Sequence, residues 1–390
     1  FNSCLDYEDL RENPNEPTSV PPSLIFTQIL PGATSAFSDT YEIPQYHIRS
    51  NADGSPVDYR FGSSGFNYGT LRNVKKMEEE AERANAPVYF IMAKFLRAYN
   101  WLDEANTELN DFISNNPGTT IEGDIYFNGN LRNWQKVINA YTIRVLLHLS
   151  KKENDTDLNI KGRMANIINN PSKYPLMTSM SDNMQLTHKD EDDYRGTYNP
   201  TNAAYKVDVI LAKTIMDLLK INQDPRLKTL ADPTPNAVAA NPDITVVRAD
   251  FNSYEGADTA ETTSNNVLRR SNGAISRPNE ERYWNFVGQP SLVISYFEQE
   301  LYIAEAAHRG WVSSNAKEHY DNGVLASMEY FGVANSDATD YITTKQPYIT
   351  GANGLTRIHE QMYIAFTENS GWESFFLTRR TGVPAYSFSS

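Results

Sequence analysis

Apolar side chains recur every three or four residues in several segments, which is the spacing of residues along one face of an α-helix. The clearest segments are 89–99, 134–149, 207–219, 301–311, 320–328 and 355–367. Helical patterning begins near residue 71 and continues almost to the end of the sequence. The pattern therefore predicts a fold dominated by α-helices.

The predicted helices favour a repeat of helical hairpins. Segments 301–311 and 320–328 are separated by a break at 310–314, with alanines at positions of close contact and aromatic residues at others. This arrangement is typical of tetratricopeptide-like hairpins, although no strict 34-residue period is present. We expect an all-α fold, with hairpins at about 71–220 and 290–370.

Long polar segments interrupt the predicted helices at 179–201 and 231–282, both rich in Asn, Asp, Thr, Gly and Pro. Loops of this length are uncommon in compact domains and are usually functional or disordered. The prolines of segment 1–31 predict an extended tether. We therefore expect a tether at 1–31 and a single domain at 32–390, with a loop-rich region wrapped on the hairpins.

Composition narrows the classes of partner. The 390 residues carry a net charge of −14, and the 35 Lys and Arg residues are scattered along the chain. Without a basic stripe to neutralise phosphates, nucleic acid is not an expected partner. Aromatic residues make up 12% of the chain, including 23 tyrosines, which combine an apolar face with a hydrogen-bonding edge and suit sugar rings.

The single cysteine, Cys4, follows Phe1-Asn2-Ser3. Small residues before a cysteine resemble the end of a bacterial lipoprotein signal, after which that cysteine carries the lipid. The sequence predicts lipid attachment at Cys4, while an incidental thiol in a disordered tail remains the alternative.

Residue patterns for catalysis are weak. The six histidines lack metal-ligand spacing, and no glycine-rich phosphate loop follows a predicted strand. The acidic run 189–193 lacks the spacing of a calcium loop, so a solvated loop is the preferred interpretation. We expect no enzyme activity, no cofactor and no metal, although spacing alone does not decide whether two carboxylates face one another as in a glycosidase.

Two polar segments combine aromatic rings with planar polar groups, as sugar recognition requires. One runs from Arg282 to Phe286 and the other from Arg195 to Pro200. The alternative role for both is anchoring a loop to the core. The candidate ligand contacts are Arg282, Tyr283, Trp284, Asn285, Phe286, Tyr198 and Asn199.

Four groups of residues resemble the SusD/RagB family, in its SusD-like branch associated with Bacteroidetes outer membranes. They are Ser3–Tyr7 with Asn13–Thr18; Ala93–Tyr99; Glu300–Trp311 with Ala316–Tyr320 and Gly323–Ser327; and Gln361–Phe366 with Gly371–Glu373 and Arg379–Pro384. One departure is the direct junction of Asn100 and Trp101, where the family has a loop and a further helix. Either the loop is lost or a segment is absent from this sequence.

The resemblance implies a SusD-like helical fold and a lipoprotein anchored through Cys4 to the outer membrane, facing the exterior. It also implies capture of an oligosaccharide or polysaccharide for a SusC-like TonB-dependent transporter. A peptide-binding or purely structural assembly subunit is the alternative, and a glycoside hydrolase is a third hypothesis. The family shares no ligand-contact motif, so the glycan and its contacts are not implied.

Overall fold

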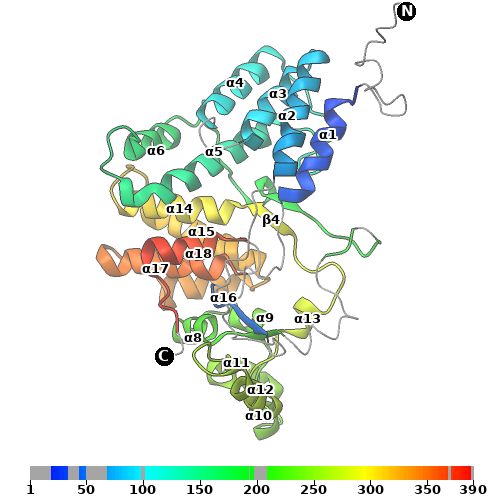
Figure 1. Cartoon of the computed structure of the whole chain (residues 1–390). Coiled ribbons are helices and arrows are strands. Elements are labelled where there is room, and N and C mark those ends of the chain that lie inside the picture. The colour runs from blue at the N-terminus through cyan, green and yellow to red at the C-terminus, as the bar shows by residue number, and fades with distance from the viewer. Residues whose placement is uncertain are drawn as a thin grey trace, which may run out of the picture. The chain divides into compact units, whose positions relative to one another are not determined.

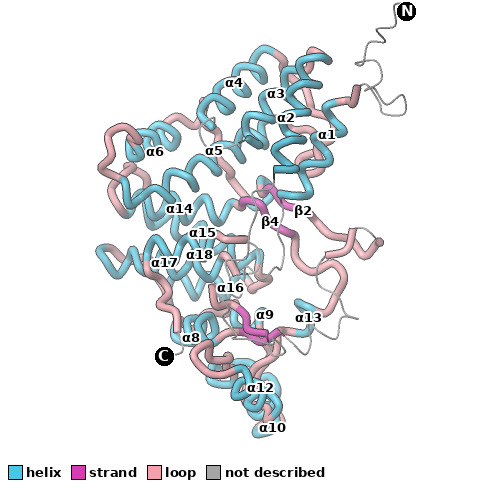
Figure 2. The backbone as a smooth tube through the Cα atoms, viewed as in Figure 1, coloured by secondary structure: helices cyan, strands magenta, loops and turns pink. Residues whose placement is uncertain are grey.

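The computed structural model describes residues 19–33, 44–49, 68–97, 102–192, 194–196, 209–367 and 370–387. Its backbone divides into two compact units, Phe1–Gly32 with Gly65–Leu131 and Ala33–Ser64 with Arg132–Ser390, where the sequence predicted a single domain after a tether. Cys4, Tyr198, Asn199 and the junction at Asn100 lie outside the described residues. Both units are mainly helical (Figures 1 and 2), as the periodicity predicted.

The first unit is a small helical assembly in which α3 packs against both α2 and α4. Its helices are α1 (Pro22–Ile29), α2 (Tyr68–Arg83), α3 (Pro87–Arg97) and α4 (Leu102–Asn115). The turn between α2 and α3 is tight, and Asn85 adopts a left-handed backbone conformation in it with φ 49°. A helical hairpin at this place agrees with the sequence pattern.

Helix α1 corrects the prediction of an extended tether up to residue 31. Pro22 occupies the start of the helix, where its missing N–H would have no intrahelical partner, so it favours the helix there. Ile25, Phe26 and Ile29 are buried along one face. The prolines therefore mark where this helix begins.

The second unit stacks most of the helices that the sequence pattern showed, together with several that it did not single out. They are α5 (Leu131–His148), α6 (Ile160–Asn169), α8 (Lys213–Ile221), α9 (Leu227–Leu230), α14 (Tyr296–His308), α15 (Ala316–Tyr330), α16 (Asn335–Asp340), α17 (Gly351–Ala365) and α18 (Glu373–Thr381). Helix α14 packs against α15 and α17, and α17 packs against α18 (Figure 1). Gly323 permits close approach of α15 to α14, since an added Cβ would lie 2.7 Å from Leu301 Cγ.

The 3-10 segments are Leu30–Ala33, Leu149–Lys152, Met180–Asp182 and Phe251–Ser253, and one π-helical turn, η6, spans Tyr341–Lys345. Four short strands among the described residues form two antiparallel pairs, β1 (His47–Arg49) with β3 (Val209–Leu211) and β2 (Met184–Leu186) with β4 (Ser291–Ile294). The helix predicted at 207–219 is wrong at its start, because 209–211 is a strand and α8 begins only at Lys213.

The predicted loop-rich segment 231–282 contains several short helices. They are α10 (Pro235–Ala240), α11 (Ile244–Ala249), α12 (Thr263–Ser271) and α13 (Glu280–Tyr283). Each begins after a side chain that accepts a backbone hydrogen bond from the first turn, and these capping residues are Thr234, Asp243, Thr262 and Asn279. The Thr, Asp and Asn residues that indicated loops therefore also mark helix starts.

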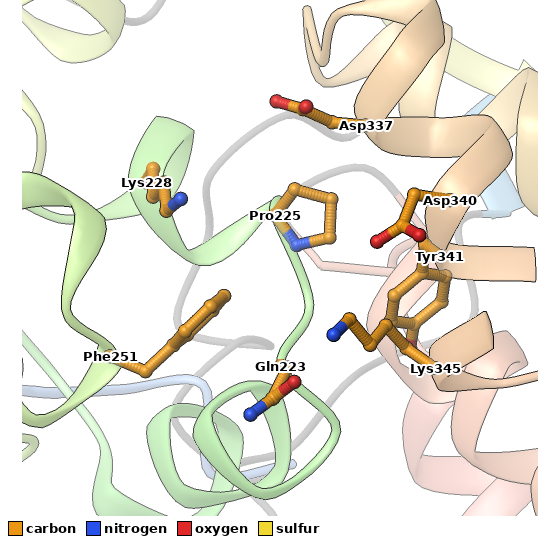
Figure 3. Close-up of a pocket in the computed structure, with 8 residues that line it drawn as sticks. All are labelled: Gln223, Pro225, Lys228, Phe251, Asp337, Asp340, Tyr341 and Lys345. Carbon is orange, nitrogen blue, oxygen red and sulfur yellow. The ribbon is translucent and has the colours of Figure 1, made fainter.

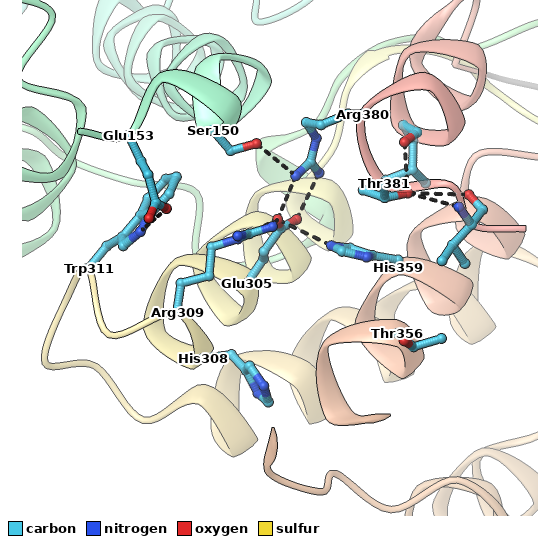
Figure 4. Close-up of polar contacts among 12 residues, drawn as sticks. Ser150, Glu153, Glu305, His308, Arg309, Trp311, Thr356, His359, Arg380 and Thr381 are labelled. Atoms are coloured by element: carbon cyan, nitrogen blue, oxygen red, sulfur yellow. Dashed lines mark hydrogen bonds and ion pairs between the residues drawn. The ribbon is translucent and has the colours of Figure 1, made fainter. Parts of the chain in front are cut away.

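A fully buried carboxylate, Glu305 of α14, joins several elements of the second unit (Figure 4). Arg380 of α18 donates to both of its oxygens at 2.5 and 2.8 Å, and Arg309 Nε lies 2.8 Å from Oε1. His359 Nε2 of α17 lies 3.2 Å from the same oxygen, and Arg380 also reaches Ser150 Oγ at 3.3 Å. Burial alone would raise the pKa of Glu305, but Arg380 and His359 hold it well below the usual value.

A second buried ion pair ties α5 to α14. Arg144 donates to both oxygens of Glu298, with Nε 2.6 Å from Oε1 and NH2 2.8 Å from Oε2. Glu373 at the start of α18 lies beside this pair and accepts from His148 at 2.8 Å and from Tyr302 at 3.2 Å. Charged groups thus fix the relative positions of α5, α14 and α18 inside the second unit.

We expect Glu305→Gln to lower the free energy of unfolding by about 3 kcal/mol, because it leaves Arg380 buried without its charge partner. Urea titration followed by circular dichroism measures the difference. Glu329→Gln on neighbouring α15, where the glutamate is exposed, is the matched control and should change stability by under about 0.5 kcal/mol. Equal stability of the two variants would contradict a structural role for the Glu305 cluster.

The stability difference between the natural protein and Glu305→Gln should depend on pH. Because the pKa of Glu305 is lower in the folded chain than its usual 4.5, its stabilisation is complete above that pH and is lost as the pH falls toward the folded pKa. The stability difference between the natural protein and Glu305→Gln should be constant near neutrality and shrink below pH 4.5. A stability difference that increased as the pH fell would contradict the lowered pKa of Glu305.

Candidate functional site

The pairing of β2 with β4 brings together the two polar segments that the sequence analysis selected (Figure 2). Leu186 pairs with Ser291, so the loop after β2 and the loop before β4 leave the strand pair at the same end. His188 Nε2 lies 2.8 Å from Ser291 Oγ, and burial lowers the pKa of this histidine. Residues about one hundred positions apart in the chain therefore become neighbours.

Beyond the strands, the two loops remain in contact through backbone and side chains. The N–H of Gly196 donates to the carbonyl oxygen of Phe286 at 2.7 Å. A Cβ at Gly196 would lie 2.7 Å from the carbonyl oxygen of Val287, so only glycine permits this approach. The Arg195 guanidinium carbon lies 4.0 Å from the centroid of the Phe286 ring, which is a close cation–π contact.

The acidic residues of segment 189–193 orient this arginine. Arg195 Nε donates to Asp190 Oδ1 at 2.8 Å, and NH1 donates to Asp192 Oδ1 at 2.7 Å. Because all three side chains are exposed, such pairs contribute at most about 1 kcal/mol and are screened by salt. Their main effect is to hold the guanidinium plane over the ring.

We define the loop surface as Asp190, Tyr194, Arg195, Phe286 and Val287. Tyr194 is 61% exposed and Val287 is 39% exposed, which places an aromatic and an aliphatic side chain in contact with solvent beside the Arg195–Phe286 stack. Aromatic rings can stack on the apolar face of a pyranose, and carboxylate and guanidinium groups can hydrogen-bond its hydroxyls. The arrangement is suited to binding a polyhydroxylated ring.

The other candidates in 282–286 have different environments. Tyr283 is fully buried, and the buried Arg282 guanidinium lies 4.8 Å from the Phe331 ring centroid. The Asn285 amide donates to the Arg282 carbonyl at 3.0 Å, and its oxygen accepts from the Val287 N–H at 3.0 Å. These three residues anchor and shape the loop, which is the alternative role that the sequence left open.

Of the candidates that lie within the described residues, two remain available for ligand contact. Phe286 belongs to the loop surface, and Trp284 is half-buried with part of its ring packed against the core. Sequence reasoning missed Tyr194, although it lies within the polar segment 179–201 directly before Arg195. An aromatic residue between an acidic run and an arginine is the signal that could have selected it.

Residues 99–389 match the model of the SusD-like family described as starch-binding and associating with the outer membrane. Since the match spans most of the chain, the protein belongs to this family, as its sequence motifs indicated. No curated protein sequence matches the chain.

Solved structures agree with this assignment. An outer-membrane protein of Bacteroides vulgatus described as involved in nutrient binding and a SusD homologue of Bacteroides fragilis are each 28% identical to this chain. Each superposes with a TM-score of 0.82 over 95% of this chain and 90% of its own. A chitin-binding SusD homologue of Flavobacterium johnsoniae shares the fold at 17% identity, with a TM-score of 0.69 over 94% of this chain and 87% of its own. The predicted helix-dominated, SusD-like fold is thereby confirmed.

None of the helices in the described ranges is both long enough and apolar enough to cross a membrane. Within the same ranges, no group of three or more His, Cys, Asp or Glu side chains is arranged to hold a metal ion.

The different burial of two tyrosines gives a stability test of the site. We expect Tyr283→Ala to lower the free energy of unfolding by about 3–5 kcal/mol, because it empties a fully buried ring position. Tyr194→Ala should change it by under about 0.5 kcal/mol, since that ring is mostly exposed. Thermal and urea unfolding of the two variants measure both values, and similar losses would mean that Tyr194 is part of the core.

Proposed function

We propose that this protein captures glycans at the outer membrane and passes them to a transporter. The loop surface is the observation that carries the proposal: a guanidinium stacked on Phe286, an exposed Tyr194 ring and flanking carboxylates provide the groups that bind a sugar ring. Aromatic stacking supplies affinity, and hydrogen bonds to hydroxyls supply orientation. The helical stack, held by buried ion pairs, provides a rigid support for the loops.

The relatives support the same proposal. The family description names starch, one relative is described as nutrient-binding, and a more distant one binds chitin. We further propose that the chain is attached through a lipid on Cys4 and faces the exterior. Its partner would be a SusC-like TonB-dependent transporter, consistent with a family described as associating with the outer membrane.

In this proposal the protein binds its ligand without a chemical step. The binding groups of the loop surface are rings, a guanidinium whose charge is paired with Asp190 and Asp192, and carboxylates engaged by that guanidinium. Capture followed by transfer of the intact glycan is the function we assign.

The test is titration of the protein without residues 1–4 against starch, chitin and host-type oligosaccharides. Trp fluorescence and calorimetry monitor binding. We expect saturable binding of one glycan class, and chromatography of the mixture should show no cleavage products. Tyr194→Ala should weaken that binding about tenfold, or about 1.4 kcal/mol, through the loss of one stacking ring.

Phe376→Ala is the matched control, because Phe376 is another exposed aromatic, 45% accessible, on α18 away from the two loops. It should bind as the natural protein does. Equal loss in both variants would contradict the loop surface as the binding site. If peptides bind and none of the glycans does, peptide capture would be favoured. Cleavage products would favour a hydrolase.

A further inference from the structure

A pocket of about 190 Å³ lies in the second unit, between the α8–α9 connection and the segment formed by α16 and the π-turn (Figure 3). None of its residues belongs to the loop surface. It is lined by Gln223, Pro225, Lys228, Phe251, Asp337, Asp340, Tyr341 and Lys345. Its volume is below the roughly 300–1,000 Å³ of pockets for drug-sized ligands, so one monosaccharide unit is a suitable size of occupant.

The floor of the pocket is fixed by a fully buried ion pair. Asp224 and Arg226, on either side of Pro225, have no exposed surface. Arg226 donates to both oxygens of Asp224 at 2.9 and 2.6 Å and to Ser327 Oγ of α15 at 2.9 Å. Although burial alone would lower the pKa of Arg226, Asp224 raises it, so the charge is retained.

The opposite wall is connected to the same arginine. Arg226 NH2 lies 2.5 Å from Gln361 Oε1, and Gln361 Nε2 donates to the Tyr341 hydroxyl at 2.8 Å. Both sides of the pocket are therefore held by one hydrogen-bond network before any ligand arrives. Preorganisation of this kind lowers the entropic cost of binding.

Two backbone irregularities border the pocket. Gln223 adopts φ 52°, a left-handed conformation that is unfavourable for a residue other than glycine. The π-turn at Tyr341–Lys345 replaces the regular continuation of α16, and such turns are frequent at functional sites. The turn carries Tyr341 and Lys345 into the pocket wall that Asp337 and Asp340 begin.

Two ammonium groups point into the pocket from opposite walls (Figure 3). Lys228 Nζ lies 5.1 Å from the Phe251 ring centroid, and Lys345 projects from the other side. Neither forms an ion pair with any residue in the described part of the chain. Two such cations facing one space can bind one anionic group between them, even though Asp337 and Asp340 bring the formal charge of the lining to zero.

The remaining groups restrict what that anion can be. Asp337 and Asp340 would repel a bare inorganic anion, but they accept hydrogen bonds from hydroxyl groups. The Gln223 amide can both donate and accept, and the Phe251 ring offers an apolar face. A ligand that joins a carboxylate to a hydroxylated ring matches all four features.

We propose that this pocket is a second carbohydrate site, which binds one uronic acid unit. The carboxylate lies between Lys228 and Lys345, the hydroxyls contact Asp337, Asp340 and Gln223, and one ring face covers Phe251. The site is separate from the loop surface and can be tested independently of it. A chain that holds an acidic sugar here would select acidic polysaccharides over neutral ones.

The experiment compares methyl glucuronide with methyl glucoside, which share a ring and differ in carboxylate against hydroxymethyl. Binding is measured by calorimetry and ligand-observed NMR on the protein without residues 1–4. Methyl glucuronide should bind at least about tenfold more tightly than methyl glucoside, because the glucoside lacks the charge-assisted contact. Lys228→Gln and Lys345→Gln should each weaken glucuronide binding about fivefold or more, and raised salt should weaken it as well.

Lys152→Gln is the matched control, since Lys152 is an exposed lysine outside the pocket, and it should leave binding unchanged. Tyr194→Ala should also leave glucuronide binding unchanged, which separates this site from the loop surface. Phe251→Leu, which keeps apolar volume but removes the ring, should weaken both sugars. Equal affinity for the two sugars, no binding of glucuronide, or preferential binding of a dipeptide would each overturn the proposal.

Discussion

The second unit depends on the buried carboxylate of Glu305. A charge in this position is strongly unfavourable unless it is fully paired. Arg380 of α18, Arg309 directly after α14 and His359 of α17 supply that pairing. Arg380 and Glu305 lie 75 positions apart in the sequence, so the pairing is formed only when the helices have stacked correctly. Misplaced stacking would leave several buried charges unsatisfied, which makes the native arrangement far more favourable than its competitors.

A buried ion pair also positions the connection between α8 and α9, where no helix or strand does so. Asp224 and Arg226 are completely buried within a short connection, and the hydrogen bonds that Arg226 donates to Ser327 and Gln361 fix that connection against α15 and α17. The backbone between α8 and α9 is thereby tied to α15 and α17 by side-chain hydrogen bonds. Because the network also reaches the Tyr341 hydroxyl, the pocket geometry follows from the packing of the scaffold and needs no ligand to form it.

Sequence periodicity predicted α14, α15 and α17 because each buries an apolar face against a neighbour. The prediction failed where one residue type is compatible with two local structures. A proline such as Pro22 can end an extended segment or begin a helix, and a residue such as Thr234 or Asp243 can lie in a turn or cap a helix. The site was harder to predict, because Tyr283 and Tyr194 are both aromatic residues in polar surroundings. Tertiary packing separates them, because Tyr283 joins the hydrophobic core of the second unit whereas Tyr194 is mostly exposed.

The two proposed binding regions differ in how they are held, and this difference bears on selectivity. The loop surface is oriented by exposed pairs between Arg195 and the aspartates, which are weak and screened by salt. The pocket is built on the fully buried Asp224–Arg226 pair, which resists adjustment. Contacts held by weak, exposed pairs favour tolerant binding, whereas a pocket built on buried pairs discriminates by charge and shape. A protein that carries both can hold a long glycan along its loops while one unit is selected by its carboxylate.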